Sequence, residues 1–178
     1  NMLSRDKIIS WEALIKQSES LDDPDKLQAV NNFFNREYRF LDDQQNWHEE
    51  DYWATPIEAL VKGAGDCEDY SLAKYFTLRN LGIPSEQLRI TYVKALALNQ
   101  AHMVLTYYPT PSSDPLVLDN LVAEIRPASQ RRDLLPVYAF NAEGLYLTGK
   151  KSGDSKKLSR WQDVLKKMRD EGFAVGDG

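Results

Sequence analysis

Apolar residues recur at helical spacing in the first part of the chain and alternate with polar residues further on. Residues 4–20 are expected to form an amphipathic helix, because four apolar side chains share one stripe: Ile8, Trp11, Leu14 and Ile15. A second helix is expected from Asp22-Asp23-Pro24, where an N-cap acid precedes a first-turn proline. It buries a second apolar set: Leu27, Val30, Phe33, Phe34 and Tyr38.

The next segment leads into the most distinctive turn of the sequence. The polar stretch 42–51 is expected to be a loop. Thr55-Pro56-Ile57-Glu58 is a capping box with proline at the first helical position, and it predicts a short helix. Gly63 breaks this helix and leads into Gly65-Asp66-Cys67-Glu68-Asp69-Tyr70. From Asp66 onward the apolar spacing is helical again, so this turn is expected to start a core helix.

The second half of the chain carries the alternating, β-branched runs typical of strands. Five strands are expected, over residues 88–98, 101–108, 116–119, 137–140 and 145–147, and a hairpin turn joins the last two. The basic stretch 150–157 is expected to be a solvated loop, and apolar spacing predicts a last helix over 159–170. The 178 residues are expected to form one α+β domain, with a helical part over about 1–82, a sheet part over about 83–150 and a C-terminal helix over about 158–171.

Charge and composition limit the classes of partner. The net charge of −5 argues against nucleic acid and provides no basic face for an anionic membrane. No apolar run approaches the length that crosses a bilayer, so no membrane insertion is expected. The single cysteine, Cys67, excludes a structural thiolate zinc site and a disulfide within the chain.

Cys67 is the candidate nucleophile. Asp66 suits the N-cap position, which places Cys67 at the first helical position, where the helix dipole and free N–H groups favour a thiolate. A thiolate is the nucleophilic form of cysteine. The alternative is that Cys67 is a small buried hydrophobe at the start of a core helix.

Two further side chains complete a candidate triad in chain order. His102 lies in an expected strand, and Asp119 ends the next one. A histidine beside a cysteine can act as its base, and a carboxylate can fix the tautomer of that histidine. Taken singly, each has a structural alternative, namely a hydrogen-bonded histidine in a sheet and a turn residue at a strand end. The other histidine, His48, lies in the polar loop and is assigned no role.

Three carboxylates surround the candidate nucleophile: Asp66, Glu68 and Asp69. Such close anions raise the pKa of a thiol. One explanation is helix capping, since acids in a first turn interact favourably with the helix dipole. The other is a bound hard cation such as calcium, which takes several oxygen ligands. No EF-hand spacing is present, so the residue pattern by itself favours capping.

At these residues the chain resembles the transglutaminase-like (papain-like) hydrolases, and more closely the bacterial transglutaminase-like cysteine proteinases of the LapG type. The resemblance covers nearly the whole chain and rests on four blocks: Tyr52-Trp53-Ala54-Thr55-Pro56, Gly65-Asp66-Cys67-Glu68-Asp69-Tyr70, Ala101-His102-Met103-Val104-Leu105 and Leu118-Asp119-Asn120-Leu121. It implies an α+β, transglutaminase-like fold, in which N-terminal helices pack on a small antiparallel sheet and the catalytic cysteine lies at a helix N-terminus.

The resemblance also implies roles for the candidate residues. Cys67 would attack a peptide carbonyl, His102 would act as base and then acid, and Asp119 would orient His102. The backbone N–H of Cys67 is expected to donate to the oxyanion, whereas Trp53 is expected either in the core or as a wall of the cleft. LapG-type enzymes are calcium-dependent, and the implied ligands are Asp66, Glu68 and, more weakly, Asp69.

The substrate, partner and location are implied by the resemblance alone. It implies a periplasmic protease that cuts a large surface adhesin at a di-alanine site near its N-terminal region, which promotes biofilm dispersal. It also implies control by the periplasmic domain of an inner-membrane cyclic-di-GMP receptor. No secretory signal is visible in the sequence, and we expect that one has been removed.

Two other functions are compatible with the same residues. A transglutaminase or amidase would use the same triad and would hand the acyl group to an amine. A binding module without catalysis would keep the fold, although such a module is expected to have lost one of the three triad residues.

Overall fold

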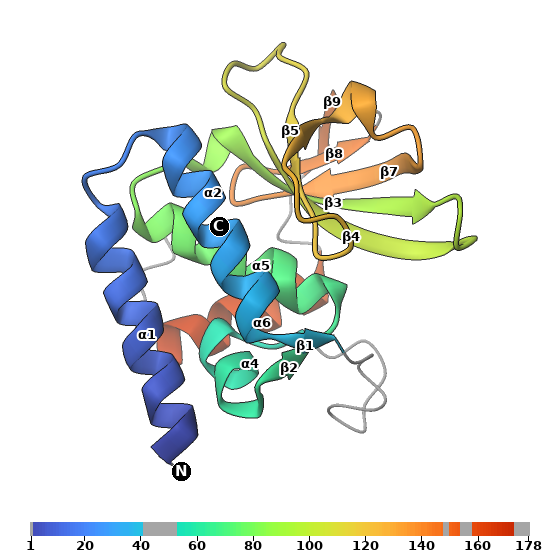
Figure 1. The fold of residues 1–178 in the computed structure, drawn as a ribbon. Coiled ribbons are helices and arrows are strands. Elements are labelled where there is room, and N and C mark those ends of the chain that lie inside the picture. The colour runs from blue at the N-terminus through green and yellow to red at the C-terminus, as the bar shows by residue number, and fades with distance from the viewer. Residues whose placement is uncertain (1, 41–52, 148–149, 154–157, 173–178) are drawn as a thin grey trace.

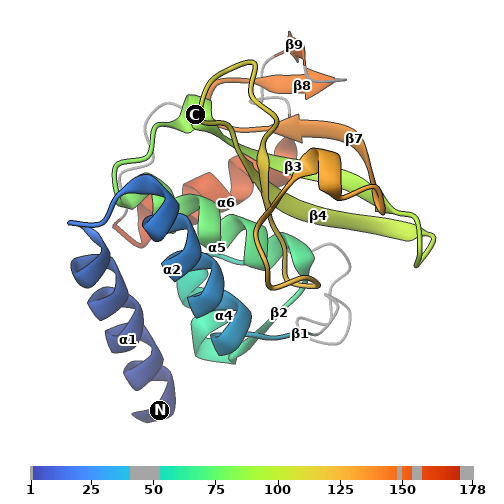
Figure 2. The same ribbon diagram turned by 45° about the horizontal axis from the view of Figure 1, so that its top comes forward.

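The computed structural model describes residues 2–40, 53–147, 150–153 and 158–172, so the polar loop with His48 lies outside the described residues. Helices gather on one side of the molecule and an antiparallel sheet forms the other side (Figures 1 and 2). Both layers bury their apolar side chains in one extended core, to which α1, α2, α4, α5, α6 and the sheet all contribute. This is the α+β arrangement that the sequence predicts.

Five α-helices lie within the described residues, with the bounds α1 Met2–Ser18, α2 Asp23–Glu37, α4 Pro56–Lys62, α5 Cys67–Asn80 and α6 Ser159–Asp170. The predicted capping signals are present in the structure. The Asp22 side chain accepts from the N–H of Asp25 at the start of α2, and Thr55 and Glu58 form the capping box of α4. Gly63 ends α4 in the left-handed conformation, at φ 73°, which a residue without a Cβ adopts readily. None of the described helices is long and apolar enough to span a bilayer.

In the part of the chain that the structure describes, the main sheet has seven strands in the order β6-β5-β4-β3-β7-β8-β9, and all its pairs are antiparallel. Their bounds are β3 Leu88–Ala95, β4 Gln100–Tyr107, β5 Leu116–Leu118, β6 Arg126–Pro127, β7 Leu134–Phe140, β8 Leu145–Leu147 and β9 Lys150–Gly153. A separate parallel pair joins β1 (Arg39–Phe40) to β2 (Ala64–Gly65), directly before α5.

The basic stretch 150–157 corrects one prediction. Residues 150–153 form β9 and pair with β8, although a solvated loop was expected over the whole stretch. Residues 154–157 lie outside the described residues. The expectation of a loop rested on charge, but an edge strand tolerates lysines, because its outer edge and one face can remain in contact with water.

Helix α5 is the central element of the fold, because it lies between the sheet and the helices α2 and α4 (Figure 2). It packs on β4 and β3 on one side and on α2 and α4 on the other. Twelve consecutive positions, from Cys67 to Leu78, are therefore buried or half-buried, including the polar residues Asp69, Ser71 and Lys74. A helix enclosed on all sides holds its first residue in a fixed position, and that residue is Cys67.

Candidate active site

The start of α5 is fixed by reciprocal hydrogen bonds between backbone and side chain. Asp66 is the N-cap residue, and Cys67 is the first residue of the helix, as predicted. Asp69 has 1% exposure, and its Oδ2 accepts from the N–H of Asp66 and its Oδ1 from the N–H of Ala54, both at 2.9 Å. Gly65 permits this close packing, since a Cβ there would lie 2.9 Å from the Cβ of Asp69. The turn is therefore held on both sides of the cysteine.

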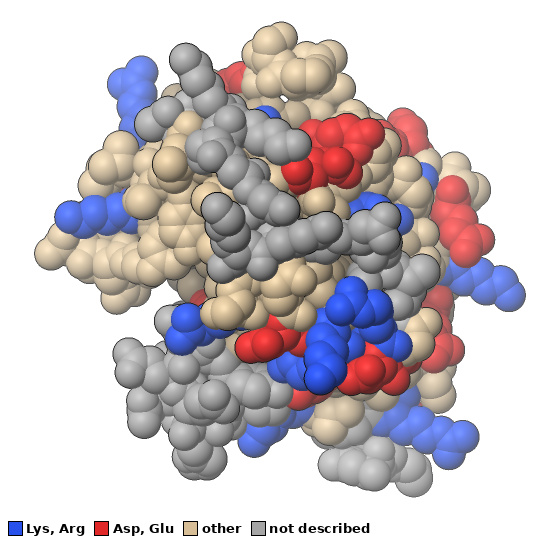
Figure 3. Space-filling view, turned by 180° about the vertical axis from the view of Figure 1, so that it is seen from behind, with Lys and Arg blue, Asp and Glu red and all other residues tan. Residues whose placement is uncertain are grey.

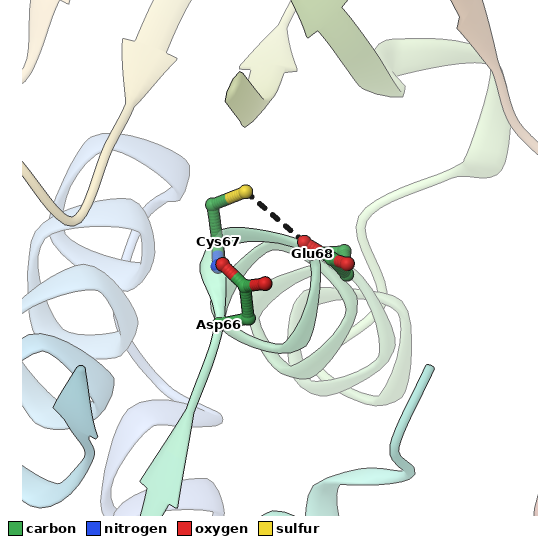
Figure 4. Close-up of side chains that lie close together, drawn as sticks. All are labelled: Asp66, Cys67 and Glu68. Carbon is green, nitrogen blue, oxygen red and sulfur yellow. Dashed lines mark hydrogen bonds between the residues drawn. The ribbon is translucent and has the colours of Figure 1, made fainter. Parts of the chain in front are cut away.

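The sulfur of Cys67 lies among carboxylates. Its Sγ donates to Oε2 of Glu68 at 3.0 Å, as the dashed line in Figure 4 shows. Burial raises the pKa of the Cys67 thiol well above its usual value, and the negative charges of Glu68 and Asp66 raise it further. A hydrogen bond with the backbone of Met103 acts in the opposite direction and lowers this pKa. The protein chain by itself thus favours the thiol, whereas the helix-start position predicted a thiolate.

His102 and Asp119 form a short, buried pair. Nε2 of His102 lies 2.6 Å from Oδ1 of Asp119, and the two residues have 5% and 1% exposure. The same Oδ1 accepts from the N–H of Leu121, and Oδ2 accepts from Nη2 of Arg131 at 2.9 Å. Burial alone would raise the pKa of Asp119, but the bonds from His102, Leu121 and Arg131 outweigh it and lower the pKa to about 2. Asp119 is therefore a carboxylate at neutral pH, which is the form that fixes a histidine tautomer.

A pocket of about 430 Å³ joins the cysteine to the histidine. Its walls combine the start of α5, strand β4, aromatic side chains and one residue of α6: Trp53, Asp66, Cys67, Glu68, Tyr92, Ala101, His102, Met103, Tyr138 and Arg160. The backbone of Met103, the residue after His102, is hydrogen-bonded with the sulfur, so this part of β4 lies against Cys67. Cys67 and His102 thus line one pocket, and Asp119 is hydrogen-bonded to His102.

Trp53 meets both of its expected descriptions. Its ring stacks on Phe140 with the ring centroids 5.5 Å apart, so it packs against the core, and it also lines the pocket. The backbone N–H of Cys67, the expected oxyanion donor, donates in this structure to Oδ1 of Asp66 at 2.6 Å. A substrate oxyanion would have to compete with the Asp66 carboxylate for that donor.

Asp66, Cys67 and Glu68 are grouped as a metal site would require, with one ligand atom from each within 4.8 Å of the others. The two carboxylates are oxygen donors of the kind that hard cations prefer, whereas the sulfur is a soft donor. The donor set therefore fits a hard cation held by Asp66 and Glu68, next to the sulfur. Asp69, the third predicted ligand, directs both of its oxygens to backbone N–H groups instead.

Three residues around Asp119 were missed by sequence reasoning. Lys74 of α5 has 1% exposure, and its Nζ donates to Oδ1 of Asn35 at 2.8 Å. Asn35 of α2 in turn donates from Nδ2 to the backbone carbonyl of Asp119 at 2.9 Å. Arg131 binds the Asp119 carboxylate directly. A lysine or arginine in the sequence is normally taken as a surface residue. Only the fold shows that both converge on Asp119, with Arg131 on its carboxylate and Lys74, through Asn35, on its backbone carbonyl.

Known proteins show the same architecture. The family model for bacterial transglutaminase-like cysteine proteinases matches residues 11–133, and no curated protein matches the chain. LapG of Legionella pneumophila is 48% identical over 93% of this chain and 89% of its own, with a TM-score of 0.85. Its calcium-bound form is 46% identical over 93% and 91%, with a TM-score of 0.85. Its EGTA-treated form is 48% identical over 93% and 89%, with a TM-score of 0.86. By family model and by structure, this chain belongs to the bacterial transglutaminase-like cysteine proteinases.

Proposed function

We propose that the chain is an endopeptidase whose reacting groups are Cys67, His102 and Asp119. The observation that carries this proposal is the 2.6 Å bond between His102 and Asp119, at a pocket that Cys67 and His102 both line. Membership of a cysteine proteinase family supports the same assignment. A sulfur, an imidazole and an ionised carboxylate in this order are the parts of a nucleophilic triad.

The two imidazole nitrogens of His102 have different roles in this proposal. Nε2 of His102 is held by Asp119, so Nδ1 is the nitrogen that takes the Cys67 proton. The sulfur then attacks the scissile carbonyl carbon, and the resulting tetrahedral intermediate collapses when His102 returns the proton to the leaving amine. Water hydrolyses the thioester in the second half of the reaction, with His102 as base, and regenerates the thiol. Asp119 stabilises the imidazolium formed in each half.

Calcium is the cation that we propose for Asp66 and Glu68. The calcium-bound form of Legionella LapG supports this choice, as does the pair of carboxylates beside the sulfur. Bound calcium would neutralise two negative charges that oppose the thiolate. Asp66 and Glu68 would then direct their oxygens to the cation, whereas they now contact the N–H and the sulfur of Cys67. We assign Asp69 to holding the turn.

For the substrate, we propose a large surface adhesin, cut at a di-alanine site near its N-terminal region and released during biofilm dispersal. Membership of this family supports the proposal. We further propose that the protein acts in the periplasm, where the periplasmic domain of an inner-membrane cyclic-di-GMP receptor sequesters it.

The proposal is tested with a fluorogenic peptide that carries Ala-Ala between its fluorophore and quencher, and with an adhesin fragment that contains the same pair. Cys67→Ala should abolish cleavage of both, while its free energy of unfolding stays within about 1 kcal/mol of the wild type, since the residue is only half-buried. Chelation by EGTA should inhibit the wild type and added calcium should restore it. Cleavage by Cys67→Ala would refute the role of the cysteine, and full activity in EGTA would refute the cation.

The products separate this proposal from its alternatives. Mass spectrometry of the adhesin fragment should show two peptides and no new isopeptide bond. Crosslinked products in the presence of an added amine would instead indicate a transglutaminase. Binding of the fragment without any covalent change would indicate a module that keeps the fold without the chemistry.

A further inference from the structure

The two oxygens of Asp119 have separate partners. Oδ1 faces Nε2 of His102 and the N–H of Leu121, whereas Oδ2 receives Nη2 of Arg131. Because each oxygen accepts hydrogen bonds, the carboxylate cannot rotate about its Cβ–Cγ bond without breaking the hydrogen bonds of both oxygens. Arg131 is the only charged partner of Oδ2 among the described residues.

Arg131 is itself held in place by a second carboxylate. Its Nε and Nη2 donate to the two oxygens of Asp133, each at 3.0 Å, in the two-pronged geometry that suits a guanidinium. Arg131 follows the short 3-10 helix η2 (Ala128–Gln130), and its backbone N–H donates to the carbonyl of Ala128. The side chain has 4% exposure, so its position is fixed by contacts rather than by solvent.

Stability alone does not account for a buried arginine here. Taking a guanidinium out of water carries a large desolvation penalty, and a buried ion pair often contributes no more than an apolar pair of similar size. Nη1 of Arg131 is buried and has no hydrogen-bond partner among the described residues, which adds to that penalty. Such a residue is better explained by what it does to Asp119.

Lys74 cannot replace Arg131 in this arrangement. Its Nζ approaches from α5 and bonds to the Asn35 amide, which reaches the backbone carbonyl of Asp119 and not its carboxylate. Four charged or titratable groups therefore surround Asp119: His102 from β4, Lys74 from α5, and Arg131 and Asp133 from the segment after η2. Of these, Arg131 alone binds Oδ2.

We propose that Arg131 is a positioning residue of this protease, which holds Oδ2 of Asp119 and so directs Oδ1 toward Nε2 of His102. The inference rests on the proposed triad, because it assigns Arg131 a function only through Asp119 and His102. It gives the segment after η2 a role in catalysis, although that segment does not line the pocket.

The test compares Arg131→Met with Arg126→Met in the full chain, using the Ala-Ala fluorogenic peptide with calcium present. Arg126 is the matched control, because it pairs with Glu124 on the surface, where the two side chains have 44% and 68% exposure. Arg131→Met should lower kcat about 10- to 100-fold, the size expected when a reacting group is misplaced, with KM changed less than about twofold. Arg131→Lys should recover only part of the lost kcat, since a lysine keeps the positive charge but lacks the planar guanidinium that donates two hydrogen bonds side by side.

The pH profile provides a readout that a purely structural role would not change. Arg131→Met removes a positive charge beside the His102–Asp119 pair, so its pH profile of kcat should move to higher pH. Arg126→Met should retain the wild-type kcat and profile. A wild-type kcat and pH profile in Arg131→Met would overturn the proposal.

A substrate-free measurement separates this inference from the proposed function. The chain has two histidines, so the imidazole nitrogen signals of His102 in NMR can be assigned with a His48→Gln variant. The Nε2 signal should shift in Arg131→Met and not in Arg126→Met. This result would support the positioning role even if the peptide were not cleaved. An unchanged Nε2 signal would overturn the positioning role even if the wild type cleaved the peptide.

Asp133→Ala decides the case if Arg131→Met does not fold. The Asp133 side chain is 48% exposed, so its removal should leave the fold intact while it frees the guanidinium from its anchor. A lowered kcat with a shifted Nε2 signal would support the role of Arg131. Wild-type values for both would overturn it.

Discussion

At the residue scale, three carboxylates within four positions have three different partners. Glu68 accepts from the Cys67 sulfur, Asp66 accepts from the Cys67 N–H, and Asp69 accepts from two other backbone N–H groups. The sequence shows only that the acids are adjacent, and it was the family resemblance that implied calcium ligands in Asp66, Glu68 and, more weakly, Asp69. The structure divides them, because a helix places successive side chains in different directions. Asp69 points back beneath the turn, whereas Asp66 and Glu68 line the pocket.

This division predicts opposite behaviour for two variants. Asp69→Asn should lower the free energy of unfolding by about 1–3 kcal/mol, because one buried N–H loses its acceptor, and the loss should be the same in calcium and in EGTA. Glu68→Gln should instead lose most of the stabilisation by calcium and keep its stability in EGTA. Thermal melting in the two buffers measures both. If Asp69→Asn lost the calcium effect, Asp69 would be a ligand after all.

The proposed triad and the residues that support it differ in how far the sequence predicts them. Cys67 was singled out because glycine and a helix cap surround a lone cysteine, and His102 and Asp119 because they follow it on successive strands. Arg131 and Lys74 carry no such local signal. Their roles depend on burial and on contacts across α2, α5 and the segment after η2, which no local pattern encodes.

At the element scale, helices with a capping box or regular apolar spacing were predicted well. The structure places α4 at Pro56–Lys62, where a capping box is present, and α6 at Ser159–Asp170, where apolar spacing alone predicted it. The short pairs β1–β2 and β5–β6 were not predicted as pairs, because two- and three-residue strands are too short to show alternation. Their formation depends on the neighbours that the fold provides.

Helix α6 is predicted to be essential for stability, although it lies beyond the residues that the family model matches. Trp161 has 0% exposure, stacks on Phe76 and meets the edges or faces of Tyr75 and Phe140 at centroid distances of 5.1–5.6 Å. Trp161→Ala should therefore lower the free energy of unfolding by about 3–5 kcal/mol. Urea denaturation measures this loss.

The control for this prediction is another substitution by alanine within a helix. Ile9 of α1 is 52% exposed, so Ile9→Ala should change the free energy of unfolding by no more than about 0.5 kcal/mol. Equal effects of the two substitutions would show that α6 adds little to the core.

At the scale of the whole molecule, charge is distributed unevenly between surface and interior. On the face seen from behind, basic and acidic side chains lie next to one another, which agrees with a modest net charge of −5 (Figure 3). The interior also holds charged side chains, which is unusual. Four of them are buried: Lys74, Arg131, Asp69 and Asp119. Stability should consequently depend on pH through these groups more than through the surface.

Lys74 gives that dependence an unusual sign. Burial lowers the pKa of Lys74 from 10.5 to about 7, and the Asp119 charge only partly offsets it. Between about pH 7 and pH 10.5 the unfolded chain therefore holds a proton that the folded chain releases. The contribution of Lys74 to the free energy of unfolding is lowest below about pH 7. Above that pH the contribution rises by up to about 1.4 kcal/mol per pH unit.

Lys74→Met isolates this contribution from those of Cys67 and the buried tyrosines. The variant loses the bond to Asn35, which shifts its stability by an amount that does not depend on pH. Its free energy of unfolding relative to the wild type should therefore be most favourable at pH 6–7 and should decline by about 1.4 kcal/mol per pH unit toward pH 9. Urea denaturation of both proteins at pH 6, 7.5 and 9 measures the difference. A difference that stays constant with pH would mean that Lys74 remains charged in the folded protein, with Asp119 and Asn35 fully compensating its burial.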